Sequence, residues 1–249
     1  MTDTATSTPL PVVAPKGLLT RVIGVFTSPR ETYADIAARP TILGAFIISL
    51  LLIVVPTGVL SMTERGKEMA IDQAYRAMQG MERALGRPLP DDAYDQMETR
   101  MRQQRIPFQQ IAGQVVFVPV VFAIEAGILF VAFTSILGGD ARFKQVLAVV
   151  AFASIIGGVG ALFAVPIMYA KQSFSSPTSL TIFLPFLDPK SFFAGFLGWI
   201  DLFRLWWVVN LSIGLGVLYK KRTTPIAMSL LAVYAVFALV ATAVVSMFA

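Results

Sequence analysis

The sequence of 249 residues contains no cysteine and no histidine. The lack of cysteine excludes disulfides and thiolate chemistry, and the lack of histidine removes the commonest general base and the commonest metal ligand. Charge is also scarce, because charged residues make up 14% of the chain, whereas a typical soluble domain has about 25%. A chain with so little charge cannot cover its apolar surface in water, so we expect an integral membrane protein.

Motifs of catalysis are missing as well. The sequence has no GxxxxGK[ST] phosphate loop, no GxSxG nucleophile elbow and no HExxH metal motif. We therefore predict that the protein is not an enzyme and needs no cofactor; a membrane-embedded hydrolase is the weakest of the possible functions. The pI is near 9.6, but the basic residues cluster beside apolar runs. That placement is typical of membrane helices, so nucleic acid is not an expected partner.

Five apolar stretches are long enough to cross a bilayer. They predict an all-α, polytopic transmembrane bundle with five spans, at about 41–62, 111–137, 146–169, 194–218 and 225–247. The first contains no charged residue, and at about 1.5 Å per residue it would measure about 33 Å, enough for a hydrocarbon core of about 30 Å. Small residues at four-residue spacing in the third stretch, among them Gly157 and Gly158, favour close approach of a neighbouring helix.

Three segments lie outside these spans. Residues 1–15 are rich in Thr and Pro and are predicted to form a disordered tail, and 16–40 to form two amphipathic juxtamembrane helices. The pattern leaves open whether the first of these lies on the membrane surface or packs on the end of the bundle. Residues 63–110 hold eight basic and eight acidic residues and predict a charged helical hairpin outside the bilayer. A solvated spacer is favoured there over a partner-binding element.

The second juxtamembrane helix has a clear start signal, Ser28-Pro29-Arg30-Glu31. Ser28 is placed to cap the helix, Pro29 suits the first helical position, and Glu31 is placed to reach back to the cap amide. Later in the chain, residues 171–191 carry an apolar piece too short to span, which predicts an interfacial or re-entrant segment.

Polar residues inside the predicted spans are the candidate site. They are Glu125, Asp201, Arg204 and Asn210. A charge at mid-span costs roughly 2.5–3.5 kcal/mol, so such residues need partners or a function. Asp201 and Arg204 are three residues apart and could pair on one helix face, and Arg204 could reach Glu125 on another helix. We favour a structural polar clamp over an ion, proton or substrate site.

Three stretches resemble the YIP family of Ypt/Rab-interacting membrane proteins in its bacterial form. They are VFTSPRETYADIAARP, LGGDARFKQVLAVVAFAS and LGWIDLFRLWWVVNLSIGLGVLYKKRTTPIAMSLLAVYAVF. The resemblance implies a five-helix bundle with a cytosolic N-terminus and no catalytic residue, and it maps Pro29, Glu31, Asp201 and Trp206 onto family motif positions. Eukaryotic members bind prenylated GTPases. This chain has a short tail that is not acidic, which argues against GTPase binding here.

The distribution of basic residues gives the same orientation. Nine of them fall on the side predicted to face the cytoplasm: Lys16, Arg21, Arg30, Arg39, Arg142, Lys144, Lys220, Lys221 and Arg222. We expect a multi-pass protein of the cell inner membrane with its C-terminus outside. The leading hypothesis is a non-enzymatic protein that organises the bilayer or binds a membrane-protein partner or a second copy of itself. The alternative is a small transporter or channel that uses the intramembrane polar residues.

Overall fold

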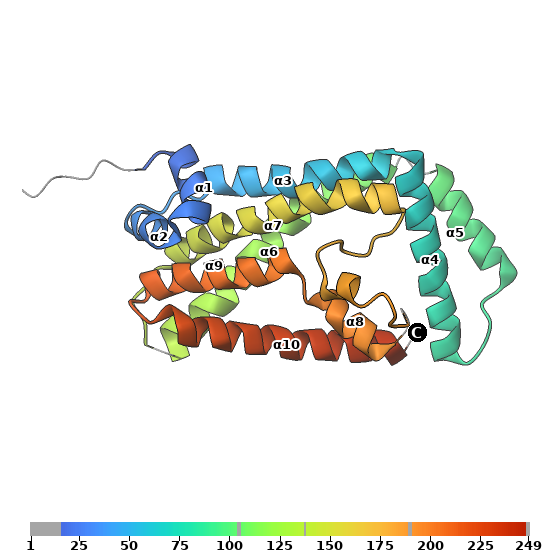
Figure 1. Cartoon of the computed structure of the whole chain (residues 1–249). Helices are drawn as coiled ribbons and strands as arrows, with labels where there is room; N and C mark the ends of the chain where they lie inside the picture. Colours follow the sequence, from blue (N-terminus) through green and yellow to red (C-terminus); the bar gives the residue numbers. More distant parts are fainter. Residues whose placement is uncertain (1–15, 104–105, 137, 189–190, 248–249) are drawn as a thin grey trace, which may run out of the picture.

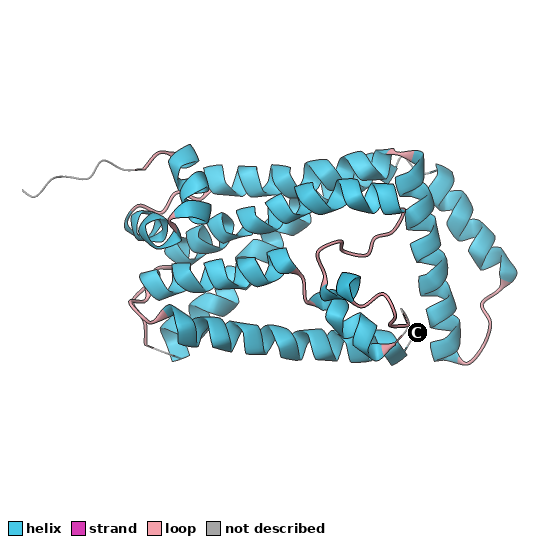
Figure 2. Ribbon diagram, in the orientation of Figure 1, coloured by secondary structure: helices cyan, strands magenta, loops and turns pink. Residues whose placement is uncertain are grey.

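The computed structural model describes residues 16–103, 106–136, 138–188 and 191–247. This part of the chain is helical, without a strand of a sheet (Figure 2), which confirms the predicted all-α class. The helices are α1 (Leu18–Thr27), α2 (Pro29–Ala38), α3 (Leu43–Met62), α4 (Glu64–Leu85), α5 (Asp91–Gln103), α6 (Ile106–Phe130), α7 (Phe143–Lys171), α8 (Phe192–Trp199), α9 (Leu202–Leu218) and α10 (Thr223–Met247). A π-helical turn, η1 (Val131–Ile136), extends α6, and a short 3-10 helix, η2 (Leu180–Phe183), precedes α8.

Four segments are long and apolar enough to cross a membrane: Leu43–Met62, Ile111–Ser135, Phe143–Lys171 and Thr223–Ser246. Their positions agree with four of the five predicted stretches. The chain is thus a multi-pass membrane protein, because helices satisfy their own backbone hydrogen bonds in lipid and four such segments are present.

The predicted continuous helix at 194–218 is wrong. The structure breaks it at Ile200 and Asp201 into α8, of 8 residues, and α9, of 17 residues. The helix breaks at Asp201 because its carboxylate accepts hydrogen bonds from the backbone amides at the start of α9. In one continuous helix the carboxylate would instead lie on the side of the helix. α9 is apolar but shorter than the four long segments.

Helix α7 forms the centre of the bundle, with α3, α6 and α9 packed around it. Its residues from Val146 to Ile156 are almost all buried. Close approach to α3 depends on a small residue, since a Cβ on Gly158 would come within 2.6 Å of Leu52 Cβ. Ser49 on α3 also donates a 2.9 Å hydrogen bond to the Ala151 carbonyl. Helix α10, in contrast, packs on α9 and α8 and leaves much of its apolar surface exposed.

The four helices that were predicted to lie outside the bilayer are found at opposite ends of the long helices (Figure 1). α1 and α2 lie at the end where α9 passes into α10. α4 and α5 run across the other end, near the end of α10. α4 and α5 pack on each other through Tyr75, whose ring is stacked on that of Tyr94 with centroids 5.6 Å apart. The charged segment therefore forms two antiparallel helices beyond one end of the bundle.

A buried ion pair fixes α1 to α2. Arg21 is 3% exposed, and its Nε donates a 2.7 Å hydrogen bond to Asp35 Oδ2. Its Nη1 donates to Thr41 Oγ1 at 2.7 Å and to the Arg39 carbonyl at 3.1 Å. One guanidinium thus joins α1, the end of α2 and the start of α3.

The start of α2 is only partly as predicted. Pro29 does occupy the first turn of α2, but Ser28 makes no side-chain capping hydrogen bond. Glu31 instead pairs with Lys16 at 3.7 Å. The predicted capping box is therefore wrong, because the glutamate side chain is engaged by the lysine that precedes α1.

Candidate functional site

The break between α8 and α9 is held by a loop that folds back into the bundle. After α7 the chain returns towards the middle of the long helices before it reaches η2 and α8 (Figure 1). Ser179 and Asp201 form an isolated antiparallel bridge. In it, the Leu180 amide donates to the Ile200 carbonyl at 2.9 Å, and the Leu202 amide donates to the Thr178 carbonyl at 3.1 Å. The loop thereby satisfies backbone groups that the helix break would otherwise leave unpaired.

Asp201 is the N-cap of α9. Its Oδ1 accepts hydrogen bonds from the amides of Phe203 (2.9 Å) and Arg204 (3.2 Å). Its Oδ2 accepts from Ser176 Oγ at 2.6 Å and from the Thr178 hydroxyl. The carboxylate is buried and has four donors, so its charge is stabilised by the α9 terminus and two hydroxyls.

The expected pairing of Asp201 with Arg204 is not seen in the described part of the chain. The Arg204 guanidinium lies instead over the Trp199 ring, 5.3 Å from its centroid. The reason is geometric, because Asp201 precedes the first turn of α9 and directs its oxygens along the helix axis to the free amides. Arg204 thus keeps a cation–π contact with the last residue of α8.

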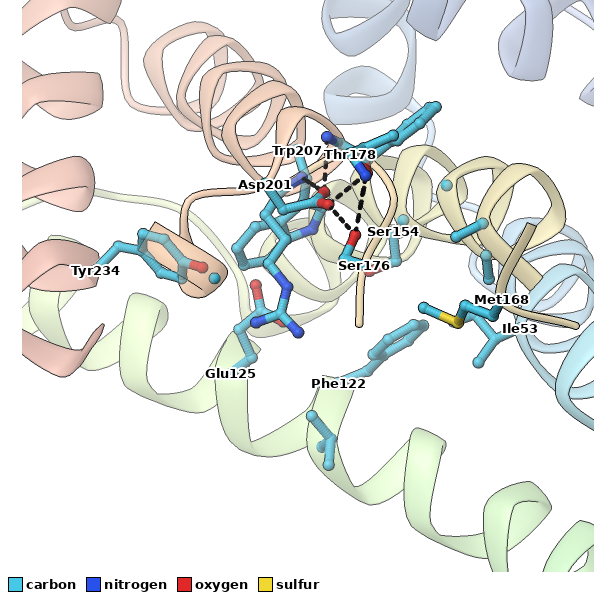
Figure 3. Close-up of a pocket in the computed structure, with 18 residues that line it drawn as sticks. Ile53, Phe122, Glu125, Ser154, Met168, Ser176, Thr178, Asp201, Trp207 and Tyr234 are labelled. Atoms are coloured by element: carbon cyan, nitrogen blue, oxygen red, sulfur yellow. Dashed lines mark hydrogen bonds between the residues drawn. The ribbon is translucent and has the colours of Figure 1, made fainter. Parts of the chain in front are cut away.

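A cavity of about 490 Å³ lies beside this break. Its walls come from α3, α6, α7, α8, α9, α10 and the loop between α7 and η2, residues 172–179. Its polar lining includes Glu125, Ser154, Ser176, Asp201, Arg204 and Tyr234. In Figure 3, Glu125 extends from α6 towards the side of the cavity where Asp201, Ser176 and Thr178 lie. Three of the four predicted polar residues thus share one cavity.

Glu125 is the unusual member of this set. Its Oε1 is buried and has no hydrogen-bond partner among the described residues. A buried polar atom without a partner costs roughly 1–3 kcal/mol, so such an atom in a cavity is a natural contact point for a bound group. Glu125 lies inside the candidate span Ile111–Ser135.

Asn210 has a different role from the other three. Its Nδ2 donates to the Val25 carbonyl at 2.9 Å, and its Oδ1 accepts a 2.5 Å hydrogen bond from the Tyr33 hydroxyl. It does not line the cavity and instead attaches α1 and α2 to α9. Position in the sequence could not separate these roles, because Asn210 lies only six residues beyond Arg204 in the same helix.

Trp206 packs near the cavity, and three residues that were not predicted as site residues line it. The Trp206 ring meets Phe26 edge-on, with centroids 5.4 Å apart, so it packs α9 against α1. Ser176, Thr178 and Tyr234 line the cavity without having been predicted. The Ser- and Thr-rich run before η2 was the one sequence signal for two of them. Tyr234 donates a 2.5 Å hydrogen bond to the Trp199 carbonyl at the end of α8.

The chemistry of the cavity suits binding. Among the residues that the structure describes, no group of three acidic, histidine or cysteine side chains could hold a metal ion. The cavity offers one carboxyl with an unpartnered oxygen, one guanidinium on an aromatic ring, hydroxyls and apolar walls. These groups can hold a small polar or amphiphilic ligand by hydrogen bonds and ion pairing.

Comparison with known families decides the classification. The model of the Yip1 domain matches residues 23–245, from within α1 almost to the end of α10. The chain belongs to the Yip1 family. The predicted resemblance to the YIP family is thereby confirmed. Neither the curated proteins nor the solved structures gave a match to this chain. The matched region includes the second half of α1, all of α2, the bundle, the loop between α7 and η2, and the cavity.

Proposed function

We propose that this Yip1-family protein is a non-enzymatic, five-span protein of the cell inner membrane that organises the bilayer around it. The observation that carries the proposal is the exposed apolar face of α1. Leu19 is 73% exposed and Ile23 is 61% exposed, one helical turn apart. Leu18 contacts the start of α3 at Gly44, next to the exposed Leu43. The apolar face of α1 therefore continues the lipid-facing surface of α3, as in a helix inserted at the interface.

The five-span topology requires α9 to act as the fourth crossing. Its 17 residues would cover about 25 Å at 1.5 Å per residue, and the re-entrant loop and α8 fill the remaining depth. The end that carries α1, α2 and the basic residues 220–222 would face the cytoplasm. The end that carries α4, α5 and the C-terminus would lie outside.

The absence of cysteine makes this topology easy to test. Single cysteines at Asp140, before α7, and at Ser173, after α7, would be treated with a membrane-impermeant maleimide in intact cells. We expect labelling at position 173 and labelling at position 140 only after the membrane is opened. Labelling of both positions in intact cells would contradict the proposed topology.

The organising role can be tested with vesicles. We expect reconstituted protein to narrow the distribution of vesicle diameters towards small values, and the Leu19→Ser/Ile23→Ser variant to lose this effect. The Met81→Ser/Leu85→Ser variant is the matched control, because these two exposed apolar residues lie on α4, away from the α1 end. Equal vesicle sizes with wild type and the α1 variant would contradict the proposal.

Organisation of the membrane would also involve a membrane-protein partner or a second copy of the chain. The broad exposed apolar surface of α10 supports this part of the proposal. Crosslinking in native membranes, followed by purification in detergent, would test it; a chain recovered as a lone monomer would count against it. A GTPase is not proposed as the partner.

The cavity supports a second candidate, a small transporter or channel. Glu125 and Arg204 line the same cavity, beside a broken helix. Glu125 has an unpartnered oxygen, and Arg204 has no carboxylate partner among the described residues. Broken helices and intramembrane charges are typical of substrate sites in transporters. Solute or ion flux into proteoliposomes that is lost in Glu125→Gln would favour this function. The Tyr234→Phe variant would show whether flux needs the hydrogen bond from Tyr234 to the Trp199 carbonyl at the end of α8.

A further inference from the structure

A second cavity, of about 460 Å³, lies at the α1–α2 end of the molecule, far from Glu125 in the sequence and on different parts of the helices. Four cationic side chains line it: Arg30 from α2, and Lys220, Lys221 and Arg222 from the connection between α9 and α10. The other lining residues are Ala34, Gly216 and Val217, so no acidic residue contributes to the described wall. Two segments at least 190 positions apart thus bring four positive charges to one space.

These four cations have no ion-pair partner within the described chain. The acidic residues of the neighbouring helix α2 are engaged elsewhere, Glu31 with Lys16 and Asp35 with Arg21. All four cationic side chains are exposed and are therefore accessible to a ligand. A concentration of positive charge without internal compensation favours an external anion.

The connection between α9 and α10 that carries three of the four cations has an ordered backbone. Lys220 has a φ of 53°, a left-handed conformation that is uncommon for a lysine. The Lys221 amide donates a 2.9 Å hydrogen bond to the Gly216 carbonyl, which closes the end of α9. Arg222 then directly precedes Thr223, the first residue of α10, so the positive end of that helix dipole adds to the charge at this end.

We propose that this cavity binds the phosphate group of an anionic phospholipid. The chemistry is that of a phosphate held by guanidinium and ammonium groups. A lipid is the favoured source because the cavity lies where α9 ends and α10 begins, and exposed apolar residues such as Met228 follow on α10. The headgroup would occupy the cavity while the acyl chains run along α10. Basic pockets of this kind at the cytoplasmic side of membrane helices suit anionic headgroups.

The general preference for basic residues at the cytoplasmic face of a membrane would explain basic loops. It would not explain why four cations from two distant segments line one cavity. Arg39 and Lys144 are exposed cations that do not line the cavity, although the orientation rule treats them in the same way. They provide a matched control with the same loss of one Arg and one Lys. The proposal rests on the chain being a membrane protein and not on its organising role.

The test uses the full chain in a zwitterionic or non-ionic detergent. Dihexanoyl phosphatidylglycerol would be titrated while the melting temperature is recorded by circular dichroism. We expect saturable stabilisation of wild type, a loss of apparent affinity of about ten-fold or more in Lys221→Gln/Arg222→Gln, and about five-fold in Arg30→Gln. The Arg39→Gln/Lys144→Gln control should bind as wild type does.

Three outcomes would overturn the proposal. One is an equal loss of affinity in the control variant, which would indicate a general charge effect. Another is equal stabilisation by dihexanoyl phosphatidylcholine, and the third is equal stabilisation by inorganic phosphate, which would exclude the lipid as the source of the anion. Because the melting temperature without lipid is measured for each variant, a variant that fails to fold is identified directly. Arg30→Gln then serves as the independent variant, since it changes α2 and not the connection.

Discussion

The Tyr33 hydroxyl donates a 2.5 Å hydrogen bond to Asn210 Oδ1, and these two residues, 177 positions apart, join α2 to α9. Both side chains are buried. Asn210 Nδ2 also donates to the Val25 carbonyl on α1. The side-chain amide of one residue in α9 thus contacts both short helices and helps to attach them to the bundle. The ordinary pKa of a tyrosine already lies well above neutral pH, and burial raises the pKa of Tyr33 further, so the hydroxyl is protonated and can donate.

Tyr33→Phe should destabilise this attachment. The substitution leaves Asn210 Oδ1 buried without its donor, which costs about 1–3 kcal/mol. We expect a lower melting temperature in detergent by circular dichroism. The double variant Tyr33→Phe/Asn210→Leu should be less destabilised than the sum of the two single variants, because each single change already removes the shared hydrogen bond. Strict additivity would show that the two side chains do not interact.

The ion pair between Arg21 and Asp35 gives a second prediction about the same end. Arg21→Met leaves the Asp35 carboxylate next to buried surface without its partner. Removal of one member of a buried ion pair usually lowers the free energy of unfolding by about 3–5 kcal/mol. We expect a marked fall in melting temperature and increased protease cleavage between α1 and α3. The control is Lys67→Met, which removes an exposed pair with Glu64 and should change stability by about 1 kcal/mol or less. Similar effects of the two variants would contradict the role given to Arg21.

Two adjacent glycines of α7 provide the sharpest comparison of packing. A Cβ on Gly158 would lie 2.6 Å from Leu52 Cβ, whereas a Cβ on Gly157 would meet nothing within 4 Å. Gly158→Ala should therefore push α3 from α7 and destabilise the protein by about 1–3 kcal/mol. Gly157→Ala should be neutral or slightly stabilising, because alanine favours the helix. Thermal melting of the two variants in parallel would check this, and equal melting temperatures would contradict the packing.

The spans could be predicted largely because hydropathy is a local property. A charge-free run such as 41–62 needs lipid whatever the rest of the chain does, and α3 begins and ends within two residues of it. The small residues of α7 also indicated close packing, but spacing alone could not show that Gly158 faces α3 while Gly157 does not. That distinction depends on which neighbour lies against which face.

The polar residues were harder to place because their partners are distant in the sequence. Asp201 looked like a charge within a continuous span, and the hydroxyls that bond it belong to Ser176 and Thr178 on a loop that folds back. Asn210 looked like a member of the same cluster, yet it bonds to Tyr33. Of the four predicted residues, Glu125 has a buried oxygen without a partner and Arg204 has no carboxylate partner among the residues that the structure describes. No local pattern in the sequence distinguishes these two from structural residues.

The contact between Tyr75 and Glu98 predicts a pH dependence outside the bundle. The Tyr75 hydroxyl donates a 2.5 Å hydrogen bond to Glu98 Oε2, and Arg102 Nε donates one of 2.7 Å to Oε1. The hydrogen bond from Tyr75, followed by that from Arg102, lowers the pKa of Glu98 below its ordinary value. A lowered pKa in the folded state means that the contact stabilises the α4–α5 pair above the ordinary glutamate pKa. The contribution is lost as the pH falls through the lowered value.

We therefore expect α4 and α5 to separate in acid while the bundle stays folded. Spin labels on cysteines introduced at Ala77 and Thr99, both exposed, would report the distance between the helices without background from native cysteine. The distance distribution should be narrow at neutral pH and broaden below the ordinary glutamate pKa. Glu98→Gln should give a broader distribution that depends little on pH, because the charged acceptor is absent throughout. A narrow, pH-independent distribution in both proteins would show that the stacked rings of Tyr75 and Tyr94 are sufficient to hold the pair.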